Sequence, residues 1–188
     1  MDLDLTTLKQ MESLTELLVS IGWVLGLALF IAGFVAIKKH SEAPNQHNLS
    51  TAIMMIFAGV MLISLDAFYL AVVGTITPDA ADGARDILLR NAVTEYASSL
   101  NTNALSDLSY AQYLPTDLGP TLVGFVYVVG LLSFIKGIYL LKDVGVHNQQ
   151  NVGARSATHI IGGVLAMNIL DFSCIIGEFL GIQAFCLA

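Results

Sequence analysis

Charged side chains are scarce in this sequence, and the residue patterns of the common enzyme classes are missing. Only 12% of the 188 residues are charged, whereas 55% are hydrophobic. Soluble domains contain about 25% charged residues, so this composition excludes an ordinary soluble domain. No segment carries a Ser–His–Asp set, a phosphate-binding glycine loop, a nucleotide motif or a cluster of metal ligands. The sequence therefore predicts a non-enzymatic protein with no cofactor or metal and no directly bound nucleic acid.

Cysteine is also rare, and the start of the chain lacks the features of an export signal. The two cysteines are Cys174 and Cys186, and their spacing fits neither a zinc site nor a redox motif. On a continuous helix they would lie about 18 Å apart, so we expect no bond between them. Cys174 fits a small buried side chain, whereas Cys186 could pair with a second chain. The first residues are acidic, whereas a secretory signal begins with basic residues, so no cleavage is expected.

Four long apolar runs take up most of the chain. They cover residues 16–37, 50–73, 121–141 and 157–185. About 20 helical residues cross the hydrocarbon core of a bilayer, and backbone polar groups in lipid must bond internally. The sequence therefore predicts an all-α membrane protein with four transmembrane helices. Residues 1–73 would form a first hairpin with an acidic N-terminal tail, residues 74–120 a loop outside the cytoplasm, and residues 121–188 a second hairpin.

Basic residues gather at the two short connections between the apolar runs. Five of the eight lie in or beside them, namely Lys38, Lys39, Lys136, Lys142 and Arg155. The long loop instead carries six acidic and two basic residues. Because lysine and arginine are enriched in cytoplasmic loops, both short connections are expected in the cytoplasm. Both termini and the 74–120 loop would then lie on the opposite side of the membrane.

The 74–120 loop is long for a bare connection, which indicates structure within it. Leu89, Val93, Tyr96 and Leu100 recur at the spacing of one helical face, and Pro78 could open that helix. Such a helix could lie on the membrane surface or on its own bundle. It could equally dock a partner, and the residues do not choose between the two.

The two hairpins match one another at an offset of 104 residues. Gly26, Gly33, Lys38 and Gly59 correspond to Gly130, Gly137, Lys142 and Gly163. Ser64 falls opposite Asn168, and a slip of one residue then aligns Asp66 with Asp171. We therefore predict a tandem duplication in which both hairpins enter the membrane in the same sense.

Glycines lie where close contacts between helices are expected. A large apolar side chain is as stable in contact with lipid as in contact with protein, so hydrophobicity does not explain why a membrane helix carries glycine. Close approach of two helix backbones does. In the fourth run, Gly163, Gly177 and Gly181 would form one side of a straight helix. The predicted packing positions are Gly26, Gly33, Gly59, Gly130, Gly137, Gly162, Gly163, Gly177 and Gly181.

Polar residues interrupt the second and fourth runs. Asp66 lies in the second run, and Asn168, Asp171 and Glu178 lie close to one line of the fourth. On straight helices Asp66 and Asp171 would each lie about 22 Å from the cytoplasmic side. A charged group at that depth is costly, so it indicates either an ion or proton path or a polar contact between helices. The polar contact is favoured, because no basic residue accompanies the acids and the broken helices typical of transporters are not evident.

One segment of the fourth run resembles a known family. Residues 154–163 read ARSATHIIGG, and Asn168 follows five residues later. With the chain length, the four helices and the small-residue final helix, this segment resembles the IcmC/DotE family. Its members are membrane proteins of the Dot/Icm type IVB secretion system and are similar to TraQ of IncI-type conjugation systems. Each hairpin also resembles a VirB-type pilin, in which two apolar helices are joined by a short basic connection.

The resemblance implies a non-enzymatic component of the bacterial inner membrane, with the termini and the 74–120 loop in the periplasm. Such a component would help to assemble a translocation channel or a pilin-like oligomer. Implied partners are membrane lipid, including a bound phospholipid, a second copy of the chain, and other membrane proteins of the secretion system. The alternative is a small ion- or proton-coupled transporter or channel that uses Asp66 and Asp171.

Overall fold

The computed structural model describes residues 2–44, 48–76, 118–144 and 151–181. Over these residues the regular structure is entirely helical. The elements are α1 (Asp2–Glu42), α2 (Leu49–Ile63), α3 (Leu65–Ile76), α6 (Leu118–Leu140), the 3₁₀ helix η3 (Leu141–Asp143), α7 (Val152–Met167) and α8 (Ile169–Leu180). The helix predicted within the 74–120 loop lies outside the described residues.

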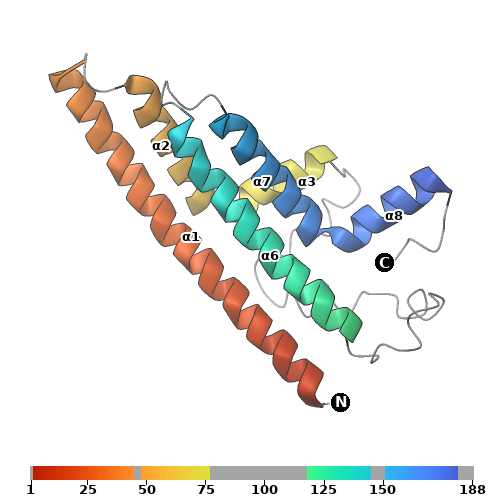
Figure 1. Ribbon diagram of the computed structural model, residues 1–188. Coiled ribbons are helices and arrows are strands. Elements are labelled where there is room, and N and C mark those ends of the chain that lie inside the picture. The colour runs from red at the N-terminus through yellow and green to blue at the C-terminus, as the bar shows by residue number, and fades with distance from the viewer. Residues whose placement is uncertain (1, 45–47, 77–117, 145–150, 182–188) are drawn as a thin grey trace.

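Four helices run side by side along one axis (Figure 1). α1 and α2 form one antiparallel pair, α6 and α7 form a second, and α1 also packs on α6. The connected ends of both pairs therefore lie at the same end of the bundle. This end carries Lys38 and Lys39 in α1, Lys142 in η3 and Arg155 in α7. Its orientation toward the cytoplasm stays a prediction.

α1 joins the predicted acidic tail and the first apolar run in one helix of 41 residues. Its length is about 61 Å, roughly twice the hydrocarbon thickness of a bilayer. Lys39 and His40 lie in its last turn, where positive charge stabilises the helix dipole. The tail is therefore part of the helix and not a separate segment.

Two helices are long and apolar enough to cross a membrane by themselves, within Thr6–Glu42 and Gly119–Asp143. The number rises to four if α2 with α3 and α7 with α8 each count as one span. The structure thus supports an all-helical chain with membrane-spanning segments. The assumption that the second and fourth runs are each one continuous helix is wrong, and the predicted four spans are present only if each bent pair crosses the membrane as one.

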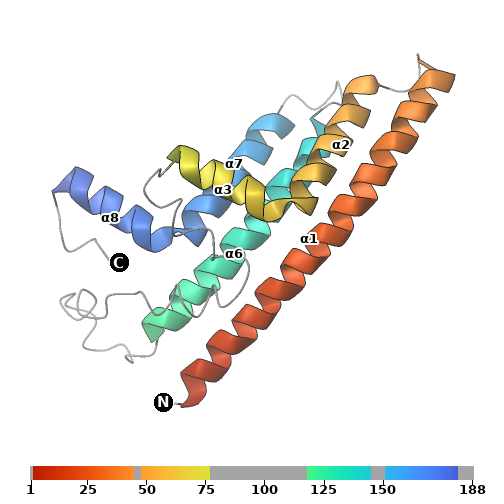
Figure 2. The same ribbon diagram turned by 180° about the vertical axis from the view of Figure 1, so that it is seen from behind.

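Both of those runs bend sharply. α2 and α3 meet at Ser64 with an angle of 91°, and α7 and α8 meet at Asn168 with an angle of 90°. α3 and α8 leave the bundle on the same side, as the two opposite views show (Figures 1 and 2). Because each axis turns before its aspartate, the depth of about 22 Å that straight helices would give Asp66 and Asp171 no longer applies.

The core is centred where α3 crosses α6. Tyr69, Tyr127 and Phe134 are among the largest fully buried side chains. Phe134 stacks on Phe68 with ring centroids 5.5 Å apart, and it meets Tyr69 edge-on at 5.9 Å. Such ring pairs contribute about 0.5–1.5 kcal/mol each beyond the burial of their surface. These ring contacts hold α3 of the first hairpin against α6 of the second.

The two helix pairs are staggered along the bundle axis. Gly22 of α1 lies against Ile135 of α6, since a Cβ atom on this glycine would be 3.7 Å from the isoleucine side chain. At the offset of 104, Ile135 corresponds to Ile31 and not to residue 22. The contact therefore joins residue 22 to the counterpart of residue 31. The second helix pair is thus displaced relative to the first by about nine residues, or about 13 Å along the bundle axis.

α8 ends earlier than the fourth apolar run predicts. Gly181 follows Leu180 in the left-handed conformation, with φ of 67°, and its amide hydrogen-bonds back to the helix. Glycine is the usual residue in such a helix cap. Cys174 is disulfide-bonded, and the only other cysteine is Cys186, which lies outside the described residues. The expectation of an unpaired Cys174 assumed a helix running past residue 181, and it is wrong.

Candidate functional site

Glycine contacts join the backbones within each helix pair. A Cβ atom on Gly26 would lie 2.9 Å from the carbonyl oxygen of Gly59, and one on Gly130 would lie 2.9 Å from that of Gly163. In the opposite direction, a Cβ on Gly59 would lie 2.7 Å from the backbone nitrogen of Phe30. One on Gly163 would lie 2.7 Å from that of Phe134. Only glycine fits these four positions without moving a helix. The α1–α2 and α6–α7 contacts coincide at the offset of 104.

A second glycine contact lies nearer the connected end of each pair. A Cβ on Gly33 would lie 3.0 Å from the backbone nitrogen of Ile56, and one on Gly137 would lie 2.8 Å from that of Ile160. In the second pair the hydroxyl of buried Ser156 also donates to the Gly137 carbonyl over 2.7 Å. We call the two sets of glycine contacts the α1–α2 seam and the α6–α7 seam.

The other predicted packing glycines lie elsewhere. Gly162 has no heavy atom within 4 Å of a Cβ built on it, so it meets no other helix among the described residues. Gly181 caps α8 and is equally open. Gly177 is buried, but it lies in α8 beyond the bend at Asn168. Gly163, Gly177 and Gly181 therefore do not form one side of a straight helix, because the axis turns by 90° between the first and the other two.

The two bends have the same local chemistry. The Ser64 hydroxyl donates to the Val60 carbonyl over 2.7 Å, and the Asn168 side-chain amide donates to the Val164 carbonyl over 2.8 Å. Both residues have similar non-helical dihedral angles, −104° and 46° for Ser64 and −109° and 37° for Asn168. Serine and asparagine favour such turns because their side chains can replace a backbone partner.

A polar junction links the second bend to α3. Asn168 donates from its side-chain nitrogen to the Tyr69 hydroxyl over 2.7 Å, and both side chains are buried. The amide oxygen of Asn168 and one carboxylate oxygen of Asp66 are buried without a hydrogen-bond donor among the described residues. Unpaired buried acceptors are costly, so each of these two oxygens is a place where the protein would accept a hydrogen-bond donor or a proton.

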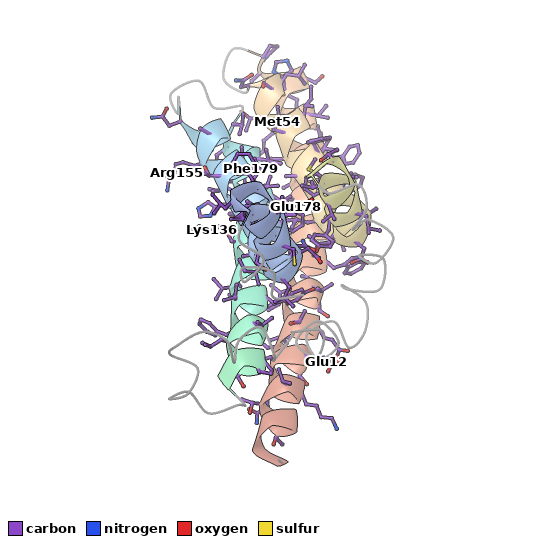
Figure 3. All side chains as sticks on the ribbon, turned by 90° about the vertical axis from the view of Figure 1, so that its right-hand side faces the viewer. Glu12, Met54, Lys136, Arg155, Glu178 and Phe179 are labelled. Carbon is purple, nitrogen blue, oxygen red and sulfur yellow. The ribbon has the colours of Figure 1, made fainter. Side chains whose placement is uncertain are left out.

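The predicted line of three polar residues is divided by the bend. Asn168 is the break residue, Asp171 lies half-buried in the first turn of α8, and Glu178 is exposed near the outer end of α8 beside Phe179 (Figure 3). Tyr69 belongs to the junction but was not predicted, because a tyrosine in an apolar run is typical of a core position. Its spacing of three residues from Asp66 places both in the first turns of α3 and was the available signal.

A groove of about 550 Å³ lies between α1 and α6. Its walls are apolar apart from Ser133, Lys136 and His159, and the Ser133 hydroxyl lies 3.1 Å from the His159 ring nitrogen Nδ1. An apolar groove beside a cationic side chain suits the acyl chain and headgroup of an anionic lipid. Among the described residues no three His, Cys, Asp or Glu side chains gather closely enough to hold a metal ion.

Comparison of the chain with models of protein families, with curated proteins and with solved structures finds no match. The class of the protein is defined by the geometry of its described residues, which are helical, include helices long and apolar enough to cross a membrane, and form two glycine seams and two matching bends.

Proposed function

We propose that this chain is a non-enzymatic component of a type IVB secretion or conjugation apparatus in a bacterial inner membrane. The observation that carries the proposal is the pair of glycine seams, which make each hairpin a rigid packing unit in a chain with large exposed apolar faces. The choice of this apparatus rests on the resemblance of residues 154–163 and Asn168 to the IcmC/DotE family. Its function would be assembly of the translocation channel or of a pilin-like oligomer.

We further propose that the two hairpins are a tandem duplication. The seam contacts of Gly26 with Gly59 and of Gly130 with Gly163 coincide at an offset of 104 residues, as do the bends at Ser64 and Asn168. Apolar sequences resemble one another by chance, but matching backbone contacts and matching bends are independent of hydropathy. Only Asp66 and Asp171, second in α3 and third in α8, need a slip of one residue.

Co-purification tests the assembly function. The tagged chain is extracted in mild detergent from cells that carry a type IVB apparatus, and co-eluting proteins are identified by mass spectrometry. Other membrane proteins of the apparatus should co-elute. Gly163→Leu, which opens the α6–α7 seam, should lose them, whereas Gly162→Leu in the next, open position should keep them. A chain that elutes alone and can be deleted without loss of translocation contradicts the proposal.

The bends favour a second candidate function, an ion- or proton-coupled transporter. Discontinuous helices at corresponding positions of two repeats are typical binding sites in transporters. The argument from the sequence against this function had two grounds, the absence of a basic residue beside the acids and unbroken helices, and the second is wrong. The unpaired oxygens of Asp66, in the first turn after one bend, and of Asn168, at the other bend, are acceptors of the kind that such a site needs.

Asparagine substitutions distinguish the two functions. If the acids carry protons or ions, Asp66→Asn and Asp171→Asn should abolish flux in proteoliposomes while the protein stays assembled. If they are polar contacts, Asn should be tolerated, because an amide still forms interhelical hydrogen bonds worth about 0.6–2 kcal/mol. Leucine at the same positions should then be more harmful than asparagine. Flux that requires the carboxylates in a fully assembled protein would replace the assembly function with transport.

A further inference from the structure

The groove between α1 and α6 carries charge of one sign. Lys136 lines it, and none of the described residues around it is acidic. A lysine within an apolar span is costly unless an anion or water meets its ammonium group. Lys136 forms no ion pair among the described residues, whereas Lys142 is paired with Asp143 over 2.9 Å. The groove therefore holds a positive charge that the described part of the chain does not neutralise.

A second unpaired cation lies beside Lys136. The Ser133 hydroxyl lies 3.1 Å from the His159 ring nitrogen Nδ1, so these two residues are neighbours across α6 and α7. Lys136 follows Ser133 by three residues, and Arg155 precedes His159 by four. Each cation is therefore one helical turn nearer the connected end on the same side of its helix. Lys136 and Arg155 lie on the same side of the bundle (Figure 3), and Arg155 also forms no ion pair among the described residues.

The remainder of the groove is apolar. Away from the connected end it continues along Val129 and Leu132 of α6 and Leu18 of α1. Val129 is 45% exposed and Leu132 is 46% exposed, so a lipid chain can reach this part from the bilayer. The groove is thus cationic at one end and apolar along the rest of its length. A matching ligand has an anionic group beside an apolar chain.

The first hairpin has an equivalent hollow that lacks these basic side chains. The hollow lies between α1 and α2 and has a volume of about 460 Å³. At the offset of 104, three of its lining residues are the counterparts of the basic residues in the second hairpin. The three are Ala32, Thr51 and Met55, which correspond to Lys136, Arg155 and His159. Because the hollow forms without basic side chains at these positions, packing does not require them, and their presence in the second hairpin indicates a ligand.

We propose that the second hairpin binds a phospholipid with a net negative headgroup. The headgroup phosphate lies between Lys136 and Arg155, and one acyl chain occupies the apolar part of the groove. Basic pockets between membrane helices bind anionic headgroups in this way. The occupant is a lipid and not a soluble anion, because the groove next to the cations is apolar and opens along a helix long enough to span the membrane.

Lipid binding to the purified full chain tests the site. The chain is delipidated in detergent and titrated with phosphatidylglycerol, or with phosphatidylcholine, which has the same acyl chains but no net charge. Native mass spectrometry counts the bound lipid. One phosphatidylglycerol should bind per chain, at least about tenfold more tightly than phosphatidylcholine. Equal binding of the two lipids, or binding of neither, would overturn the proposal.

Two double variants locate the site. Each basic residue beside an anionic headgroup contributes about fivefold to binding, so Lys136→Gln with Arg155→Gln should weaken phosphatidylglycerol binding about 25-fold. Lys136→Arg should retain binding. The matched control, Lys38→Gln with Lys39→Gln, removes the same charge from the connected end of the first hairpin, where both side chains are also exposed. It should leave binding unchanged. Equal losses in the two double variants would show a general attraction to positive charge and contradict the site.

A gain of binding in the first hairpin is an independent measurement. Ala32→Lys, Thr51→Arg and Met55→His together give its hollow the three basic side chains, and the variant should bind a second phosphatidylglycerol. A folded variant that still binds one lipid would contradict the role of these residues.

The headgroup without its acyl chains distinguishes a lipid from a soluble anion. Glycerol phosphate at the same concentration should not displace phosphatidylglycerol, because it leaves the apolar groove empty. Equal competition would show a site for soluble phosphate and overturn the proposal. The inference depends on the unpaired cations and not on a secretion function. A chain that binds the lipid but recruits no other protein would contradict only the assembly function proposed above.

Discussion

Gly162 and Gly163 are sequence neighbours in α7 with opposite surroundings. A Cβ atom on Gly163 would lie 2.7 Å from backbone atoms of α6, whereas one on Gly162 would meet nothing within 4 Å. Glycine costs about 1 kcal/mol relative to alanine inside a helix. At Gly163 the close approach of α6 offsets that cost. At Gly162 no contact within the described chain does.

Alanine substitutions at these two neighbours should have effects of opposite sign. Gly163→Ala forces the two backbones apart and should lower the free energy of unfolding by about 1–3 kcal/mol, as overpacked cores do. Gly162→Ala should raise it by up to about 1 kcal/mol through helix propensity. Unfolding of the two purified variants in the same detergent, followed by circular dichroism, measures both. Equal destabilisation would show that the α6–α7 seam does not depend on Gly163.

Sequence could predict that these glycines pack, but not all of their partners. The sequence match at an offset of 104 residues singled out Gly26, Gly59, Gly130 and Gly163, because it pairs glycine with glycine at these positions. It could not separate Gly162 from Gly163, since that distinction depends on which side of α7 faces α6. Asn168 was recognised as a buried polar residue, but its bond to Tyr69 joins residues 99 positions apart. Only the packing of α3 brings them together.

At the scale of the helices, the bends at Ser64 and Asn168 decide the shape of each hairpin. The Val60 and Val164 carbonyls at the two bends each accept two hydrogen bonds, one from the backbone amide and one from the side chain of Ser64 or Asn168. The helix resumes at once, since the amides of Phe68 and Phe172 donate to the carbonyls of Ser64 and Asn168. Each bend is therefore a single-residue turn between two intact helices.

Spin labels across the second bend should detect it. With labels at Arg155 and Phe179, both exposed (Figure 3), the structure predicts a separation of about 25 Å, against about 36 Å for a straight helix. Asn168→Leu removes both side-chain bonds and should move the population toward the longer distance. Pulsed electron resonance in nanodiscs measures the distribution. A single peak near the longer distance in the native chain would contradict the bend.

Hydropathy located the second and fourth runs to within about five residues at each end, but it did not predict their bends. A window average counts Ser64 as a mild interruption among leucines and isoleucines, although its side chain ends the helix. The pairing of Ser64 with Asn168 in the repeat was visible in the sequence. That both residues bend their helices depends on their backbone dihedral angles, which hydropathy does not report. Sequence therefore predicts where the runs lie and not how each one turns.

At the scale of the whole molecule, charge placement predicts orientation. Reporter fusions after residues 44 and 148 should show the cytoplasmic side, and a fusion after residue 103 should show the periplasmic side, because five of the eight basic residues lie in or beside the short connections. Replacing Lys38 and Lys39 with glutamine should weaken this preference more than Arg155→Gln does. The reverse pattern of reporter activity would contradict the orientation and the likeness to pilins together.

The stagger of about 13 Å between the hairpins has a consequence for the lipid beside a single chain. The hydrocarbon layer of a flat bilayer, about 30 Å thick, lies at one depth all around a protein. Two apolar spans displaced along the membrane normal by about 13 Å cannot both match that layer. The chain would have to tilt, or the bilayer beside it would have to curve or change its thickness.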